Sequence, residues 1–281
     1  MRIWEYFLVA IATLFAAVHI LALTQENKLL LVPVRKSKYE KFLPLGPHSL
    51  PLGPHSLPQE NCVFLPLRTG GLLVQMNLKR DPNKRSLLFC HGNSGNIDGF
   101  FALSEALKEK YNLFFLEYAG FGICQTLKEP TGKTLLLDLT EAWSLIPETQ
   151  EAILVGFSMG GGCICQFLAK VDESLMPKQI MLINSYYSLP QLVQELIPVS
   201  LLGHLMTTQW HSETGLRRYK NGHLVIVATQ DDELIPLRHS EQMVFIAKET
   251  GIQTQHILLP AGGHNGSIFY HLAVWAAALI L

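Results

Sequence analysis

The sequence predicts an α/β fold with a mostly parallel central sheet, an antiparallel edge hairpin and helices on both faces. From residue 60 onward, short apolar runs of strand length alternate with stretches whose apolar residues have helical spacing. Apolar strands without a polar face are typical of parallel sheets that are buried on both sides. Glycine-rich turns follow several of these runs, and functional residues collect at such strand ends.

The composition agrees with a globular α/β protein. The chain has 281 residues, of which 48% are hydrophobic and 16% are charged, and its formal net charge is −1. This size and apolar content suit one large domain or two small ones. Proteins that bind nucleic acid usually have a basic surface. The near-neutral net charge therefore gives no reason to expect a nucleic-acid partner.

The expected strands begin with a hairpin. Residues Cys62–Leu67 and Leu72–Leu78 flank the turn Thr69-Gly70-Gly71, which is typical of an antiparallel pair. The other strands are expected at Ser86–Cys90, Leu113–Glu117, Ala152–Phe157, Gln179–Ile183, Leu224–Ala228 and His256–Leu259. Helices are expected at Phe101–Tyr111, at Leu135–Ile146 and near residues 159–170, 189–206 and 237–248.

The N-terminal segment predicts contact with a membrane. It is apolar from Ile3 to Leu23 apart from three residues, which is about the length needed to cross a bilayer. Only Arg2 precedes it, and the best cleavage site is poor, so residues 1–25 are expected to be an uncleaved membrane anchor. A cleaved signal peptide followed by export is the alternative. Basic residues are in excess after the segment, which favours a cytoplasmic domain by the positive-inside rule.

Residues 26–59 are predicted to be a linker that precedes a domain at residues 60–281. The heptapeptide Leu43-Pro44-Leu45-Gly46-Pro47-His48-Ser49 recurs unchanged at residues 50–56, and its proline and glycine content excludes a helix. His48 and His55 are better explained by a duplication in an exposed loop than by a metal site. The five cysteines are odd in number and include no Cys-x-x-Cys pair, so buried free thiols are expected.

The most informative segment is Gly156-Phe157-Ser158-Met159-Gly160, which follows an apolar run and precedes a stretch of helical spacing. This is the pattern of a nucleophile elbow, in which a serine stands at the tip of a tight turn between strand and helix. Glycines are needed there because a Cβ atom would collide where strand and helix approach. The alternative interpretation is a serine that only caps the helix.

Other strand ends supply the groups that a reactive serine needs. The turn at residues 91–96 is rich in small residues, and its backbone amides can form an oxyanion hole with the amide of Met159. One of Asp231, Asp232 and Glu233 can orient an imidazole, and His264 follows the last strand. The imidazole takes the serine proton and the carboxylate fixes its tautomer. Serine, acid and histidine in this chain order are typical of the α/β-hydrolase arrangement.

From about residue 60 to the C-terminus the chain resembles the α/β-hydrolase superfamily. It is most similar to the branch of membrane-anchored serine hydrolases that includes lysophospholipid and monoacylglycerol lipases and protein depalmitoylases. The motifs that carry the resemblance are His91-Gly92-Asn93-Ser94-Gly95-Asn96, Glu117-Tyr118-Ala119-Gly120-Phe121-Gly122, Gly156-Phe157-Ser158-Met159-Gly160-Gly161, Asp232-Glu233-Leu234-Ile235-Pro236 and Gly263-His264-Asn265.

The resemblance implies roles for individual residues. It implies Ser158 as nucleophile and His264 as base. It implies Asp232 as the orienting acid, because the family's acid lies four residues before a proline. It also implies that the amides of Asn93 and Met159 hold the oxyanion. Asp231 is then expected to be a solvated loop residue.

A small helical cap is expected after Ile183. Its apolar side chains can line an acyl-chain pocket, pack on the core, or do both. Pro198 is expected to kink or divide the cap helix. Substrate contacts are expected from His91, Tyr118, Tyr186 and Leu189. The apolar tail from residue 268 is too short to span a membrane and is expected to be a closing helix.

The sequence therefore predicts a membrane-anchored serine hydrolase that cleaves an ester or thioester of an acyl chain through an acyl-enzyme, without cofactor or metal. The segment Ile123-Cys124-Gln125 stands where the branch has a serine and a Gly-Pro-rich stretch, so the family's substrates do not transfer directly. Two alternatives are a peptidase or small-ester esterase with the same triad, and a catalytically silent, membrane-tethered interaction module.

Overall fold

The structure is a computed structural model. It describes residues 3–26, 28, 31, 62–93, 95–124, 129–147, 149, 151–197 and 201–279. Both copies of the heptapeptide repeat lie outside the described residues.

An eight-stranded sheet forms the centre of the domain, with the order β1-β2-β4-β3-β5-β6-β7-β8. The strands are β1 (Val63–Pro66), β2 (Leu72–Gln75), β3 (Ser86–Cys90), β4 (Asn112–Glu117), β5 (Ile153–Phe157), β6 (Gln179–Ile183), β7 (His223–Thr229) and β8 (Gln253–Leu259). The hairpin β1–β2 is antiparallel and lies at one edge, where β2 also pairs antiparallel with β4. All other pairs are parallel. The expected fold class is confirmed.

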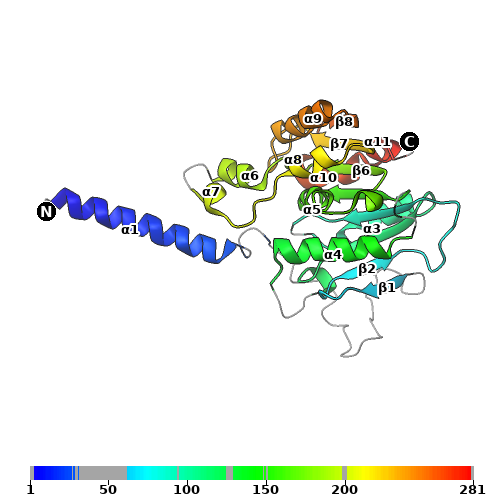
Figure 1. Ribbon diagram of the computed structural model, residues 1–281, viewed down its shortest axis with the longest axis horizontal. Helices are drawn as coiled ribbons and strands as arrows, with labels where there is room; N and C mark the ends of the chain where they lie inside the picture. The colour runs from blue at the N-terminus through cyan, green and yellow to red at the C-terminus, as the bar shows by residue number, and fades with distance from the viewer. Residues whose placement is uncertain are drawn as a thin grey trace.

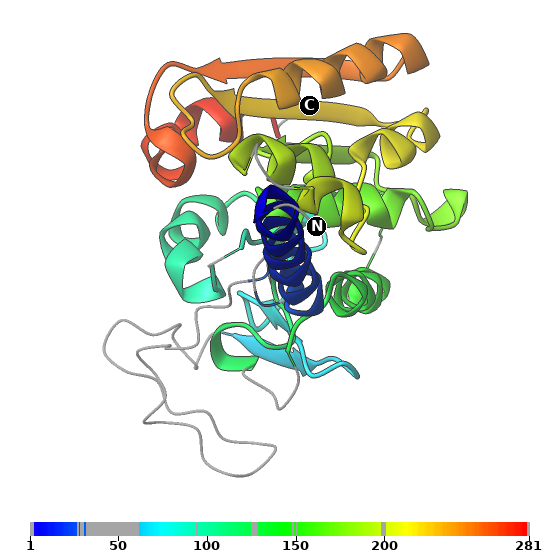
Figure 2. The same cartoon turned by 90° about the vertical axis from the view of Figure 1, so that its left-hand side faces the viewer.

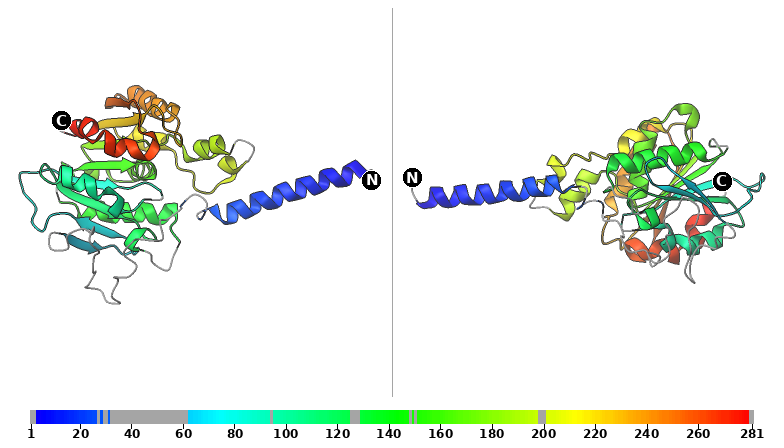
Figure 3. Two further views of the ribbon diagram at one scale, coloured as in Figure 1. Left: turned by 180° about the vertical axis from the view of Figure 1, so that it is seen from behind. Right: turned by 90° about the horizontal axis from the view of Figure 1, so that it is seen from below.

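Helices cover both faces of the sheet (Figure 1, Figure 3). One face carries α4 (Gly132–Leu145), α5 (Met159–Leu168), α8 (Ser212–Arg218) and α9 (Arg238–Thr250), and the other carries α3 (Phe101–Leu107), α10 (Gly263–Tyr270) and α11 (Leu272–Ala277). Alternate side chains of a strand point to opposite faces. Accordingly Leu154 of β5 packs in the core cluster of α4 and α5, while Val155 packs in the cluster that contains the buried Trp275.

The cap follows β6 and consists of α6 (Leu189–Leu196) and α7 (Leu202–Leu205) (Figure 1). The single helix expected at residues 189–206 is thus divided. Ile197, whose φ is −130° and ψ is 69°, is already outside helical geometry, because a residue before proline is disfavoured in the α region. Glu195 ties α6 to α9 through contacts with Arg238 at 2.6 Å and His239 at 2.9 Å.

Helix α1 (Ile3–Thr24) extends away from the domain and reaches it only at its C-terminal end, beside α7 (Figures 1 and 2). His19 Nε2 accepts a hydrogen bond from the amide of Leu201 at 3.0 Å. The carboxylate of Glu26 accepts hydrogen bonds from the amides of Thr207 at 2.6 Å and Thr208 at 2.7 Å. Burial acts to raise the pKa of Glu26, but these hydrogen bonds outweigh it and the pKa is lowered. Over the part of the chain that is described, no helix has the length and apolarity to cross a membrane.

Candidate active site

Ser158 stands between β5 and α5 with φ 53° and ψ −116°, a left-handed conformation that is strained for a residue with a side chain. The turn can only be this tight because glycine lies two residues later. A Cβ atom on Gly160 would collide with the backbone carbonyl of Cys90 at the end of β3. The Ser158 amide is held by the carbonyl of Ile183 in β6 at 2.9 Å, so two neighbouring strands fix the turn.

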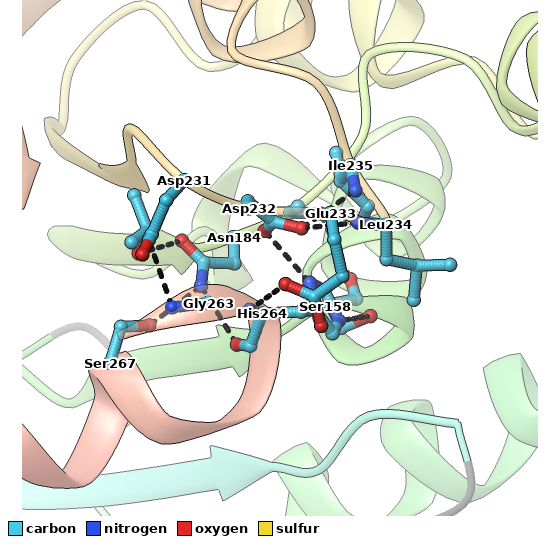
Figure 4. A network of polar contacts seen from close by, with 12 residues as sticks. Ser158, Asn184, Asp231, Asp232, Glu233, Leu234, Ile235, Gly263, His264 and Ser267 are labelled. Carbon is cyan, nitrogen blue, oxygen red and sulfur yellow. Dashed lines mark hydrogen bonds and ion pairs between the residues drawn. The ribbon is translucent and has the colours of Figure 1, made fainter. Parts of the chain in front are cut away.

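Three strand ends bring Ser158, Asp232 and His264 together (Figure 4). His264 Nε2 lies 3.0 Å from Ser158 Oγ, and His264 Nδ1 lies 2.8 Å from Asp232 Oδ2. All three side chains are largely buried. A carboxylate can only accept, so Nδ1 carries the proton and Nε2 is left to accept the serine hydroxyl. Asp232 is itself held by the amides of Leu234 and Ile235, which donate to its other oxygen at 2.9 and 2.8 Å.

The two acids beside Asp232 hold the segment that carries the histidine (Figure 4). Asp231 accepts hydrogen bonds from the amides of Gly262 at 3.2 Å and Gly263 at 2.9 Å, and Glu233 accepts one from the amide of His264 at 2.9 Å. The bond from Gly263 is the main reason that the pKa of Asp231 is lowered. Asp231 is exposed, as expected of a solvated loop residue, but it also contacts the backbone at the start of α10. His264 lies in the first turn of α10, where these carboxylates accept from the amides at the start of the helix.

Asn184 was not expected from the sequence. It follows β6 with φ 44°, and its amide nitrogen donates to the carbonyl of His264 at 2.9 Å and to Ser267 Oγ at 2.8 Å. Its oxygen accepts a hydrogen bond from Thr229 Oγ at 3.0 Å. Asn184 thus joins three strand ends. A polar residue directly after a fully buried strand is the signal that could have indicated it.

The turn after β3 is held by a buried glutamate. His91 Nε2 lies 3.0 Å from Glu117 Oε1, and both side chains are almost fully buried. The other oxygen of Glu117 accepts a hydrogen bond from the amide of Ile97 at 3.2 Å. Because His91 begins the turn and Ile97 ends it, one carboxylate holds both ends. Asn93, between them, lines the hollow at Ser158, as does Met159 at the start of α5.

Two hollows meet at Ser158. The apolar pocket, about 260 Å³, lies beneath the cap, and it is lined by Tyr186 and Leu189, two residues expected to contact substrate. Its remaining walls include Leu31, Leu192, Val193, Trp210 and Ile235. His91 and Tyr118 do not line it: both are fully buried, and their rings pack edge to face at 4.8 Å. The expectation that these two side chains contact substrate is wrong, because both are fully buried and line neither hollow.

The cysteines offer no second nucleophile at the site. The five cysteines are free and buried, and burial raises the pKa of Cys90 and of Cys165 to about 12, so these thiols are not activated. Within the described ranges, no group of three or more His, Cys, Asp or Glu side chains is arranged to hold a metal ion.

Comparison with known proteins gives one consistent result. Residues 85–185 match the family described as alpha/beta hydrolase fold. The chain is 27% identical over 185 residues to the uncharacterized protein YfhR of Escherichia coli K12, covering 64% of this chain and 62% of YfhR. It is 22% identical over 163 residues to protein bem46 of Schizosaccharomyces pombe, covering 55% of this chain and 53% of bem46. The matched part therefore spans less than two thirds of either relative.

Solved structures agree on the fold. The thioesterase domain from the curacin biosynthetic pathway superposes with a TM-score of 0.57 at 13% identity, covering 79% of this chain and 99% of that domain. At this identity the likeness concerns the architecture alone.

Proposed function

We propose that the protein is a serine hydrolase that cleaves an ester or thioester of an acyl chain. This proposal builds on the membership of the chain in the α/β-hydrolase superfamily. The observation that carries the proposal is the chain of contacts from Ser158 Oγ through the His264 ring to Asp232. A serine hydroxyl is a weak nucleophile unless an oriented imidazole removes its proton. The strained elbow presents the hydroxyl where such an attack can occur.

The reaction then follows from the positions of the three side chains. Ser158 Oγ attacks the acyl carbon while its proton passes to His264 Nε2. The bond to the leaving oxygen or sulfur breaks, and that atom takes the proton from Nε2. Water next attacks the acyl-enzyme and gives its proton to the same nitrogen, which returns it to Ser158 Oγ. Asp232 stabilises the imidazolium in both halves without becoming protonated.

The amides of Asn93 and Met159 are proposed to hold the oxygen that becomes negative in each tetrahedral intermediate. Met159 is the first residue of α5, so its amide points out of the helix N-terminus, where the helix dipole favours negative charge. The turn that contains Asn93 is fixed at both ends by Glu117. Preorganised donors of this kind are worth about 3–4 kcal/mol of transition-state stabilisation.

An acyl chain is the substrate group that the apolar pocket suits. Most of its walls are apolar side chains, including Leu189, Leu192, Val193 and Leu196 of the cap, and Ser158 lines it as well. Burial of a methylene group in such a pocket contributes about 0.8 kcal/mol. A longer acyl chain should therefore bind more tightly until the pocket is full.

Labelling with a fluorophosphonate probe tests the proposal. The probe reacts with an activated serine, so the full chain should be labelled and the Ser158→Ala chain should not be. Mass spectrometry of the labelled peptide should place the adduct on Ser158. An unlabelled parent protein with a normal circular dichroism spectrum would sink the proposal and favour a catalytically silent module. Labelled protein that cleaves aminoacyl or peptide substrates faster than acyl esters would identify a peptidase instead.

We also propose that α1 attaches the enzyme to a membrane. Six of its large apolar side chains are 46–67% exposed, namely Ile11, Leu14, Phe15, Val18, Ile20 and Leu21. Apolar surface of this extent is typical of membrane or partner contact. The contacts of His19 and Glu26 would hold the cap close to the bilayer.

Flotation with phosphatidylcholine vesicles tests this attachment. The full chain should float with the vesicles, whereas the double variant Leu14→Glu and Val18→Glu should remain at the bottom of the gradient. The matched control Leu14→Ala and Val18→Ala keeps an uncharged helix and should still float in part. A parent chain that does not float would overturn the attachment.

A further inference from the structure

The segment that follows α1 contributes a wall to the apolar pocket. Leu31 is 7% exposed and packs in the core cluster that also contains Leu192 and Trp210. It lines the apolar pocket together with Ser158, although it lies far from Ser158 in the sequence. One side of the pocket is therefore formed by a residue that precedes the predicted domain.

Glu26 fastens this segment to another part of the same wall. Its carboxylate accepts hydrogen bonds from the amide and the hydroxyl of Thr207, at 2.6 and 2.9 Å, and from the amide of Thr208 at 2.7 Å. Glu26 is itself buried, and Thr208 lines the apolar pocket. The five residues from Glu26 to Leu31 span at most about 17 Å, so these bonds confine Leu31 to the neighbourhood of Thr208.

The other walls of the pocket belong to the folded domain and its cap. Gly132 begins α4, Tyr186 follows β6, and Leu192 lies in α6. The hollow that they enclose with Leu31 is finite, about 260 Å³. Because protein interiors are close-packed, an acyl chain that exceeds the free volume has to displace a wall, which costs free energy. The volume of the side chain at position 31 therefore adds to or subtracts from the space for substrate.

Leu31 lies at the hollow proposed for the acyl chain and not at the other one. The second hollow at Ser158, about 340 Å³, has Asn96, Phe100 and His264 among its walls. Leu31 does not occur among the described residues that line it. A change at Leu31 should therefore act on the acyl part of a substrate and leave the surroundings of His264 as they are.

We propose that Leu31 sets the length of the acyl chain that the enzyme accepts, and that Glu26 positions Leu31. The inference rests on the proposed hydrolase function and deepens it, because it adds a wall from the segment after α1 to the acyl-binding site. Leu31 touches the acyl chain, whereas Glu26 acts only through Leu31 and is a positioning residue.

Hydrolysis of p-nitrophenyl esters with unbranched acyl chains of increasing length, all below their critical micelle concentrations, tests the role of Leu31. The leaving group is constant, so the profile of kcat/KM against chain length reports the acyl pocket. Leu31→Ala makes room for roughly two further methylene groups and should move the maximum of the profile to longer chains, with a gain of about fourfold for each methylene group accommodated. Leu31→Trp fills part of the pocket and should move the maximum to shorter chains, with a loss of at least about fourfold for the longest esters.

Leu31→Met is the matched control, because it keeps the apolar volume and its profile should follow that of the parent. A loss of stability alone would lower kcat/KM for short and long esters alike, so it cannot produce opposite shifts in two variants. Unfolding midpoints confirm that each variant is folded. An unchanged maximum in folded Leu31→Ala and Leu31→Trp would overturn the inference. An equal rise for all esters in Leu31→Ala would also overturn it, since Leu31 would then block the pocket instead of limiting its length.

A double-mutant cycle tests whether Glu26 acts through Leu31. Glu26→Ala releases the segment, so a long acyl chain can displace Leu31, and the ratio of kcat/KM for long over short esters should rise by about fivefold. Glu26→Gln retains one acceptor oxygen and should give an intermediate ratio. Added to Leu31→Ala, Glu26→Ala should change the ratio by less than about twofold, because the side chain that it positions is gone. A full, additive change in the double variant would overturn the positioning role.

Fatty-acid binding separates this inference from the hydrolase proposal. Isothermal titration calorimetry of unbranched fatty acids with the full chain carrying Ser158→Ala measures the pocket without hydrolysis. Affinity should rise with chain length up to a limit, and the addition of Leu31→Ala should extend that limit. Fluorophosphonate labelling of the parent, with no effect of Leu31 in either measurement, would reject the wall and keep the hydrolase. An unlabelled parent whose fatty-acid affinity still depends on Leu31 would reject the hydrolase and keep the wall.

Discussion

Asp232→Asn should lower kcat by about 10⁴-fold, whereas Asp231→Asn should cost far less. Asp232 Oδ2 accepts a hydrogen bond from His264 Nδ1 at 2.8 Å. An asparagine amide there can present its NH₂ to Nδ1, which favours the tautomer with the proton on Nε2 and leaves no acceptor for Ser158 Oγ. The imidazolium that forms in the transition state also loses its counter-charge. The effect is therefore on kcat more than on KM.

Asp231→Asn is the matched control because the two acids are adjacent in the chain and differ in what they contact. Asp231 meets only backbone amides at the start of α10, and an asparagine oxygen can still accept from one of them. Steady-state hydrolysis of an acyl ester by the two variants, with unfolding midpoints to confirm equal folding, measures the contrast. A larger loss for Asp231→Asn would move the acid of the triad by one residue.

The strands and the order of the site groups follow from local patterns, and these were predictable. Each parallel strand of the interior is buried on both faces, so its sequence is a continuous apolar run. The strand β8 was expected only from His256, but it begins at Gln253. Among the described strands β8 pairs with β7 alone, so it forms an edge of the sheet that solvent can reach. Its polar side chains can therefore stay hydrated, and a polar sequence does not destabilise the strand.

The contacts that hold the site depend on residues far apart in the sequence. Asp231 and Glu233 look like a solvated acidic loop, and their partners are amides 31 or 32 residues later. The same amides explain why α10 begins at Gly263, where the local glycines suggest a flexible turn. His91 and Tyr118 likewise stand at strand ends, yet tertiary packing buries them. Periodicity alone cannot distinguish a wall of the pocket from a residue beneath it.

Glu117→Ala should destabilise the fold by about 1–3 kcal/mol and slow the enzyme that does fold. His91 Nδ1 donates to the carbonyl of Gly92 at 2.8 Å, and its other nitrogen lies 3.0 Å from Glu117 Oε1, although the geometry between these two atoms is not that of a hydrogen bond. Removal of the carboxylate leaves the buried amide of Ile97 without its hydrogen-bond partner and His91 without its neighbour. The turn that carries Asn93 is then released at both ends.

The measurement is urea unfolding together with hydrolysis of an acyl ester, and Glu117→Gln is the control. Glutamine keeps an oxygen that can accept from Ile97, so it should unfold at a urea concentration between those of the parent and Glu117→Ala. If Asn93 holds the oxyanion, kcat should fall in the alanine variant by about 10²-fold, while labelling of Ser158 remains detectable. An alanine variant with the stability and kcat of the parent would contradict both roles. If stability falls but the kcat of the folded fraction is unchanged, Glu117 contributes to stability only. The amide of Asn93 would then keep its position without the Glu117 carboxylate.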